Sequence, residues 1–252
     1  MQKCKCSAVE IIYSDENLIV VNKPPGISVH GGVNIREKTL TDFLLEKFPD
    51  IRGVGDEPEV RPGIVHRLDK DTSGVMVVAR NQKSFEALKE LFQKRLVEKT
   101  YVAIVCGRPK IKQGIISLPI GRLVKNPLRR GVEQRKSRIR GAREAVTEYK
   151  VLREGGKYSL VELKPKTGRM HQLRVHLKAL GHPVACDKVY GGKNVCCPKE
   201  ANRQLLHAKS ISFSFPAFVG RSRFGGRRPE GRRFHFEADV PQDFDIAQKQ
   251  IV

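Results

Sequence analysis

The stretch from Arg61 to Arg80 constrains the fold more than any other part of the sequence. It reads RPGIVHRLDKDTSGVMVVAR: a Pro-Gly turn, a crowded polar segment from His66 to Gly74, and an apolar run from Val75 to Ala79. The apolar run has the length and the β-branched content of a buried strand. The polar segment is therefore a loop that leads into this strand. An apolar Leu68 inside the loop indicates that the loop is fixed against the protein and holds Asp69 in one direction. The alternative is a solvated turn between two strands.

Two further stretches combine polar side chains with regular structure. Leu163–Leu180 reads LKPKTGRMHQLRVHLKAL, a strand end and a turn followed by leucines at helical spacing. His171, Arg174 and His176 lie among these leucines. The segment from residue 98 to 105, EKTYVAIV, reads as a strand with one tyrosine, Tyr101, at its polar start.

The rest of the pattern predicts many strands and few helices. Strands are expected at 11–13, 18–21, 101–106, 145–152 and 158–164. Thr39 and Asn81 are suitable N-caps for two amphipathic helices, which end before Pro49 and at about Leu96. Short turns between neighbouring strands favour an α+β fold with a largely antiparallel or mixed sheet. Because no linker or repeat is visible, we expect a flexible N-terminus (1–10) and one domain (11–252).

The charge is strongly positive and unevenly distributed. The 252 residues carry a net charge of +21, which favours a polyanionic partner. Arg122–Arg143 has nine Lys or Arg and one Glu, and Gly220–Arg233 has six Arg and one Glu, so the two hold 13 of the 21 net charges. Both contain Gly or Pro, so we expect mobile loops that bind the phosphates of a polyanion; the alternative is that they only aid solubility. No apolar run approaches the roughly 20 residues of a membrane span, and no secretory signal is visible, which favours the cytoplasm.

The six cysteines do not show the paired spacing of a zinc site. We therefore expect no metal and interpret them as reduced cytosolic thiols. Asp69 and Asp71 share a face if they lie on a strand, which keeps a two-metal nuclease as an alternative. No third acidic residue nearby supports that alternative.

Several motifs resemble those of the RluA-type family of RNA pseudouridine synthases. They are HRLDKDTSG, KTYVAIVCG, GRMHQLRVHLKALGHPVACDKVYGG and the preceding Asn22-Lys23-Pro24. The resemblance runs from about Ile11 to about Pro216. It implies a long bent mixed or antiparallel sheet flanked by helices and loops, with the active-site cleft across its middle. The implied reaction converts uridine to pseudouridine and needs neither a metal nor a nucleotide cofactor.

The resemblance also implies roles for individual residues. Asp69 is the catalytic carboxylate, acting as nucleophile or base, and Tyr101 stacks under the uracil. A carboxylate in a water-excluding cleft needs a charge partner to stay ionised. We expect Arg174 to be that partner, with Arg169 as the alternative. Arg67 is expected to occupy the space left by the flipped nucleotide.

The expected RNA-binding residues are drawn from these motifs and from the basic stretches. They are Arg67, Arg169, His171, Lys23, Arg129, Arg130, Arg227 and Arg228. Asp71, Thr72 and Ser73 are interpreted as closing the loop by local hydrogen bonds, and Asp187 and Tyr190 as structural.

The expected partner is ribosomal or transfer RNA. We expect the protein to be a monomer that does not bind membranes. Many relatives carry a small S4-type RNA-binding domain before the catalytic part, and we expect none here because only about ten residues precede the first strand. A non-catalytic RNA-binding or ribosome-assembly protein on the same fold remains the alternative. Intact Asp69, Tyr101 and Arg174 favour the enzyme.

Overall fold

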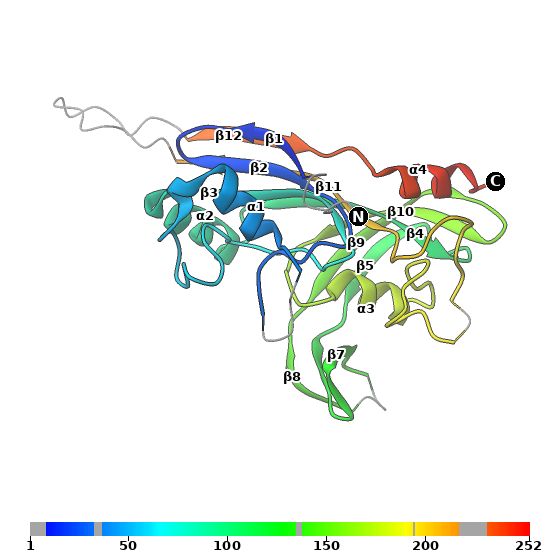
Figure 1. Ribbon diagram of the computed structural model, residues 1–252. Coiled ribbons are helices and arrows are strands. Elements are labelled where there is room, and N and C mark those ends of the chain that lie inside the picture. Colours follow the sequence, from blue (N-terminus) through cyan, green and yellow to red (C-terminus); the bar gives the residue numbers. More distant parts are fainter. Residues whose placement is uncertain (1–8, 33–36, 135–137, 194, 217–230) are drawn as a thin grey trace. The chain divides into compact units, whose positions relative to one another are not determined.

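The computed structural model describes residues 9–32, 37–134, 138–193, 195–216 and 231–252 (Figure 1). The chain divides into two compact units, and each is made of separate segments. The first unit comprises Met1–Lys70, Gly74–Glu98 and Ser210–Ala238, and the second comprises Asp71–Ser73, Lys99–Lys209 and Asp239–Val252. The expectation of one domain over 11–252 stays a prediction. Residues 1–8 of the expected flexible N-terminus lie outside the described residues.

The first unit is built on antiparallel strand pairs. β1 (Glu10–Ser14) pairs with β2 (Leu18–Lys23), and β2 pairs with β3 (Ser73–Ala79). β3 is buried along its whole length, as its unbroken apolar run predicts. The later part of β11 (Leu206–Phe215) pairs with β12 (Arg232–Glu237).

Two capped helices belong to the first unit. α1 (Leu40–Lys47) starts at Thr39, which forms a reciprocal capping box with Asp42. α2 (Gln82–Gln93) starts at Asn81, whose side chain accepts a hydrogen bond from the backbone N–H of Ser84 at 2.9 Å. Pro49 follows α1 and begins a short 3-10 helix, η2 (Pro49–Ile51). Both predicted helix starts are therefore confirmed.

The second unit contains an antiparallel set of four strands with a helix on either side. β4 (Glu98–Cys106) pairs with β10 (Tyr158–Pro165), β10 with β9 (Val146–Glu154), and β9 with β5 (Gln113–Ser117). Residues of α3 (Gln172–Ala179) pack in one core cluster with Ala103. Residues of α4 (Gln242–Lys249) pack with Ile104 in another. Successive residues of a strand face opposite sides, so the two helices cover opposite faces. The α+β class is confirmed.

The basic stretch from Arg122 to Arg143 forms strands and is not simply the loop we expected. β6 (Ile120–Leu123) lies between β7 (Asn126–Val132) and β8 (Ile139–Arg143) in a small antiparallel sheet. Ile120 and Val132 pack against the α3 residue Val175, which gives the sheet an apolar anchor. These few apolar residues are hidden among charges in the sequence. The other expected loop, 220–233, lies mostly outside the described residues, and its Arg232 and Arg233 belong to β12.

Four of the six cysteines form disulfides, so the prediction of reduced thiols is wrong for them. Cys106 is bonded to Cys196 across 90 residues of sequence, and Cys186 is bonded to Cys197 across 11. The pairing depends on the end of β4 and the segment after α3 meeting in space, which spacing alone does not reveal. Cys4 and Cys6 lie outside the described residues. Across the described part of the chain, no helix is long and apolar enough to cross a membrane.

Candidate functional site

The loop that carries Asp69 is held by a buried lysine. The Lys23 side chain is fully buried, and its ammonium group donates hydrogen bonds of 3.0 Å to three backbone carbonyls. These carbonyls belong to Pro24, Ile27 and Lys70. The backbone N–H of Gly26 donates to the same Lys70 oxygen at 2.9 Å. Lys23, which we expected to bind RNA, has its charge directed inwards in this structure and fixes the residue next to Asp69.

Two neighbours of Asp69 fix the same loop from its other end. Leu68 is only 5% exposed, which confirms that an apolar side chain fixes this charged loop. His66 Nε2 accepts a hydrogen bond of 3.0 Å from the backbone N–H of Val77, and its ring stacks on Phe92 with centroids 4.7 Å apart. No role for His66 was predicted from the sequence. Arg67 is exposed, with its Nη1 3.5 Å from His30 Nε2.

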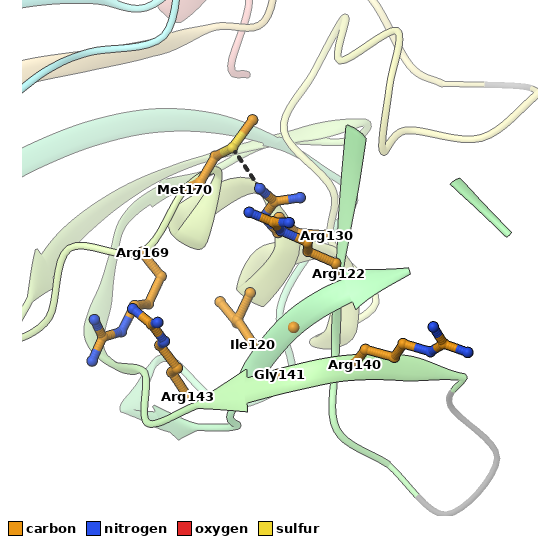
Figure 2. A pocket seen from close by; sticks show the side chains of 9 residues that line it. Ile120, Arg122, Arg130, Arg140, Gly141, Arg143, Arg169 and Met170 are labelled. Atoms are coloured by element: carbon orange, nitrogen blue, oxygen red, sulfur yellow. Dashed lines mark hydrogen bonds between the residues drawn. The ribbon is translucent and has the colours of Figure 1, made fainter. Parts of the chain in front are cut away.

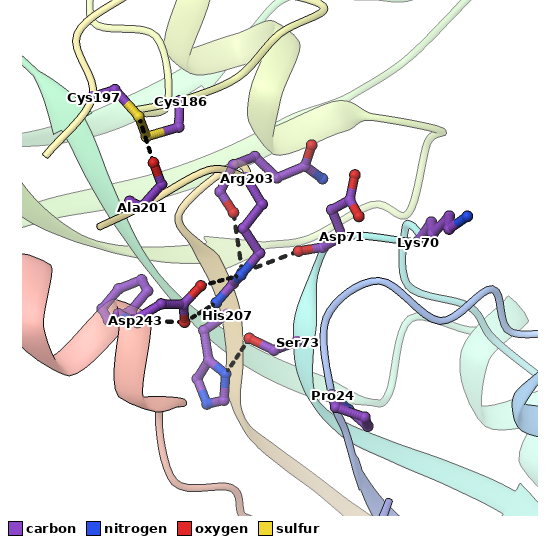
Figure 3. A network of polar contacts seen from close by, with 12 residues as sticks. Pro24, Lys70, Asp71, Ser73, Cys186, Cys197, Ala201, Arg203, His207 and Asp243 are labelled. Atoms are coloured by element: carbon purple, nitrogen blue, oxygen red, sulfur yellow. Dashed lines mark hydrogen bonds and ion pairs between the residues drawn. A yellow bond between two sulfur atoms is a disulfide. The ribbon is translucent and has the colours of Figure 1, made fainter. Parts of the chain in front are cut away.

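The next three residues, Asp71 to Ser73, belong to the second unit and are bound there by distant residues (Figure 3). Arg203 Nη1 donates to the Asp71 carbonyl at 3.0 Å, and Ser73 Oγ lies 2.9 Å from His207 Nδ1. Arg203 is itself held by Asp243 through two hydrogen bonds of 2.6 and 2.8 Å. We expected these three residues to close the loop by local hydrogen bonds, but their partners are Arg203, Gln204 and His207, more than 130 positions away.

Arg174 is buried on α3 and forms a two-pronged ion pair with Asp187. Nε donates to Oδ2 at 2.7 Å and Nη2 to Oδ1 at 2.8 Å, and the exposed fractions are 4% for Arg174 and 0% for Asp187. Burial would raise the pKa of Asp187, but the Arg174 bonds and charge, with the backbone N–H groups of Tyr190 and Val189, hold it below its usual value. Asp187 is therefore ionised and fixes the guanidinium.

The expected charge partner of Asp69, Arg174, is thus bound to another carboxylate, that of Asp187. The bonds to Asp187 use Nε and Nη2 of Arg174. Asp69 belongs to the first unit, and its pairing with Arg174 stays a prediction. Sequence reasoning missed Asp187 as a partner, although an acidic residue in the motif segment CDKVYGG was a signal for it.

Tyr190 connects the ion pair to the small basic sheet. Its ring centroid lies 5.0 Å from the Arg174 guanidinium carbon, a cation–π distance. Its hydroxyl accepts a hydrogen bond of 3.0 Å from the Arg130 backbone N–H and lies 2.7 Å from His171 Nδ1. His171 sits at the start of α3 with a left-handed backbone (φ 57°), and Tyr190 fixes its ring.

A cavity of about 540 Å³ opens beside these residues (Figure 2). Its walls come from β6, β7, β8 and the turn before α3, and the lining residues are Ile120, Gly121, Arg122, Arg130, Arg140, Gly141, Arg143, Arg169 and Met170. We call this space the arginine cavity. It brings together Arg130 and Arg169 of the expected RNA-binding set, whereas Arg129 is exposed on β7 and does not line it. Arg227 and Arg228 lie outside the described residues.

Tyr101 lies on β4, where it pairs in register with Leu163 of β10. Its half-buried ring packs against the core cluster that contains Leu173 and Leu177 of α3. Lys99, two residues earlier on the same face of the strand, has its pKa lowered by burial. The second unit thus holds Tyr101, Arg174, Arg169 and His171 on β4 and around α3.

Residues 17–179 match the family model for RNA pseudouridylate synthases. The chain belongs to this family. Asp69, Tyr101 and Arg174 fall inside the matched range, and Asp187 and Tyr190 fall after it.

Relatives and solved structures agree with this assignment. The chain is 40% identical to an uncharacterized RNA pseudouridine synthase of Synechocystis, over 82% of this chain and 62% of the relative. It is 45% identical to the ribosomal large subunit pseudouridine synthase D of Borreliella burgdorferi, over 73% of this chain and 55% of the relative. The chain thus spans about 55–62% of the length of these two relatives. The human protein named RNA pseudouridylate synthase domain containing 4 superposes with a TM-score of 0.72 at 29% identity, over 96% of this chain and 92% of that one.

Proposed function

We propose that this protein isomerises specific uridines of ribosomal RNA to pseudouridine, with Asp69 as its catalytic carboxylate. Transfer RNA is the second substrate class to test. The reaction breaks the N1–C1′ bond, turns the uracil and joins C5 to C1′, so it needs no redox partner and no hydrolytic water. We expect it to take place in the cytoplasm, catalysed by a monomer without a cofactor.

The anchored Asp69 loop is the observation that carries this proposal. A loop needed only as a solvated connection has no reason to bury Leu68 or to direct the Lys23 ammonium at the Lys70 carbonyl. Such anchoring limits the directions that the Asp69 carboxylate can take, as covalent and acid–base catalysis both require. Family membership and a relative named for the ribosomal large subunit support RNA as the substrate.

The remaining roles follow from the same proposal. Tyr101 offers a ring that is supported by the core and can stack on the uracil. Arg174 supplies a guanidinium that Asp187 and Tyr190 already hold in place. Arg67 is exposed on the loop itself, where a guanidinium can take the place of an extruded nucleotide. Arg169, His171, Arg129 and Arg130 are proposed to contact RNA.

Asp69→Asn tests the proposal most directly. The substitution keeps the shape and removes the charge, so turnover should fall at least about 1,000-fold while RNA affinity stays within a few-fold. Tritium release from ribosomal RNA labelled at C5 of uridine measures the turnover. RNA extracted from cells that lack the gene serves as the substrate, because its target uridines are unmodified.

The outcome also separates the alternative function. No tritium release by the wild-type protein from ribosomal or transfer RNA would favour a non-catalytic RNA-binding protein on this fold. Substantial turnover by Asp69→Asn would remove Asp69 from the catalytic role.

A further inference from the structure

We propose that the arginine cavity is a binding site for consecutive backbone phosphates of a single-stranded RNA segment. The inference deepens the proposed function, since the RNA would be the substrate. It rests on separate observations: the register of the small sheet, a bulge in β8, and the partners of the five arginines.

The strand register places three arginines in one row. Arg122 of β6 is directly opposite Arg130 of β7 on one side and Arg140 of β8 on the other. Directly opposed side chains lie about 5 Å apart, and like charges in such positions destabilise a sheet. A sheet that keeps this row gains stability when an anion binds over it. The row spans two strand spacings, about 10 Å, which is long enough to face more than one phosphate.

A bulge adds a fourth arginine to the same face. Arg140 and Arg143 are three positions apart, so on a regular strand they would point to opposite faces. In the observed register Ile120 faces Arg143 and Arg122 faces Arg140, so one residue of β6 is opposite two of β8. The extra residue lies at Gly141, which takes the positive φ of 61° that such bulges use. Both arginines consequently line the cavity.

The five arginines of the cavity are not neutralised within the described part of the chain, where no carboxylate pairs with any of them. Arg130 donates from Nη1 to the Pro127 carbonyl and from Nη2 to Met170 Sδ, and Arg169 donates from Nε to the Glu144 carbonyl. These contacts orient guanidinium groups without cancelling their charge. Elsewhere in the second unit, Arg174 and Arg203 are both paired with aspartates. An uncompensated cluster in a hollow attracts anions, and the guanidinium fork matches phosphate oxygens.

The shape of the cavity favours a strand over an isolated phosphate ion. A volume of about 540 Å³ is in the range that binds whole small molecules. Figure 2 shows Arg122 with Arg130 and Arg143 with Arg169 on either side of Ile120, with Arg140 farther along β8. Ile120 and Met170 add apolar surface on which a ribose or base can rest. Such a site contacts the RNA equally before and during reaction and so contributes affinity rather than rate.

The test compares two double variants that remove the same charge. Arg122→Gln with Arg143→Gln removes two positive charges from the lining of the cavity. Lys150→Gln with Arg153→Gln removes two exposed positive charges from β9, whose residues do not line the cavity. Binding of a short single-stranded oligouridylate is measured against salt concentration. Each lost phosphate contact should flatten the slope of log K by about 0.7, so the cavity variant should lose about 1.4 and the β9 variant much less.

Two further arms keep the result decisive. Arg122→Lys with Arg143→Lys keeps the charge, so it should retain the slope while binding more weakly. If the Gln variant fails to fold, unchanged affinity of this Lys variant would overturn the proposal. Uridine monophosphate should compete only weakly; displacement of the oligonucleotide at similar concentrations would assign the site to free nucleotides and overturn the proposal. Equal slopes for the cavity and β9 variants would also overturn it. Because binding is measured without turnover, the result stands even if no uridine is isomerised.

Discussion

The second unit treats its arginines in two opposite ways. Arg174 is buried, held by two hydrogen bonds to Asp187 and covered by the Tyr190 ring. The arginines of the arginine cavity line an open hollow, and among the described residues none of them is paired with a carboxylate. Tyr190 touches both regions, through its ring on one side and its hydroxyl on the other.

The difference in pairing separates an arginine that stabilises the fold from arginines whose charge is available to a ligand. An arginine that is already paired inside the protein offers a fixed position but little net attraction for an incoming polyanion. Unpaired arginines offer attraction but depend on the ligand for their final arrangement. We expect the first kind to affect catalysis and stability, and the second kind to affect RNA affinity and its dependence on salt.

Breaking the internal pair should have the largest effect. Asp187→Asn removes the buried carboxylate that is paired with Arg174, which should lower the free energy of unfolding by about 3–5 kcal/mol. Turnover should also fall, because the guanidinium loses its fixed position. Urea unfolding and single-turnover assays measure the two effects. A double variant, Arg174→Met with Asp187→Leu, should regain most of the stability but no activity.

The pH dependence of the same variant provides a second reading. The pKa of Asp187 is lower in the folded protein than in the unfolded chain. Its contribution to the free energy of unfolding is therefore complete above the unfolded pKa of about 3.9. That contribution is lost as the pH falls towards the folded pKa. The wild type should therefore lose stability more steeply in acid than Asp187→Asn. A loss below about 1 kcal/mol at neutral pH for Asp187→Asn would show that the pair is not important for the fold.

Removing the Tyr190 hydroxyl, which connects the Arg174 region to the arginine cavity, should have an intermediate effect on stability. Tyr190→Phe keeps the ring over Arg174 but removes the acceptor of the Arg130 N–H and the partner of His171. A cost of about 1–2 kcal/mol in unfolding free energy is expected, with weaker RNA binding. Tyr149→Phe is the matched control, since the one bond of the Tyr149 hydroxyl within the described residues is a long 3.4 Å contact with the Ile111 carbonyl. Equal costs for the two variants would argue against a special role for Tyr190.

Giving the arginine cavity its own carboxylate should have the smallest effect on stability. Met170 already contacts Arg130, so Met170→Glu places a negative charge beside that guanidinium. The unfolding free energy should change by less than about 1 kcal/mol, because the new pair is exposed. RNA affinity should fall and its salt dependence should weaken, and Met170→Gln controls for shape. If Glu and Gln bind RNA alike, the cavity does not attract the strand by charge.

Much of the local structure could be predicted because its signals are local. The capping residues Thr39 and Asn81 and the apolar run of β3 each carry their evidence within a few positions. Leu68 likewise indicated a fixed loop before any contact was known. The motifs around Asp69, Tyr101 and Arg174 allowed the family to be recognised, and the comparisons confirmed it.

The remaining features depend on residues that meet only in the folded chain. Asp187 reaches Arg174 because the segment after α3 turns back along the helix. The disulfides depend on Cys106 meeting Cys196, which is 90 positions away. β7 and β8 were obscured because their charges and glycines are typical of loops, while their apolar anchors, Ile120 and Val132, are few. The bulge at Gly141 could not be found without the register of the strands.

The division of the chain into interleaved segments has a consequence for synthesis on the ribosome. The first unit needs Ser210–Ala238 to complete its strand pairs, and the second needs Asp239–Val252 to supply α4. Neither unit can therefore finish folding until its C-terminal segment has emerged from the ribosome. Both units also depend on contacts between distant parts of the sequence. Such topologies fold slowly and leave apolar strands such as β3 uncovered while translation continues. The nascent protein should accordingly depend on chaperones during that interval.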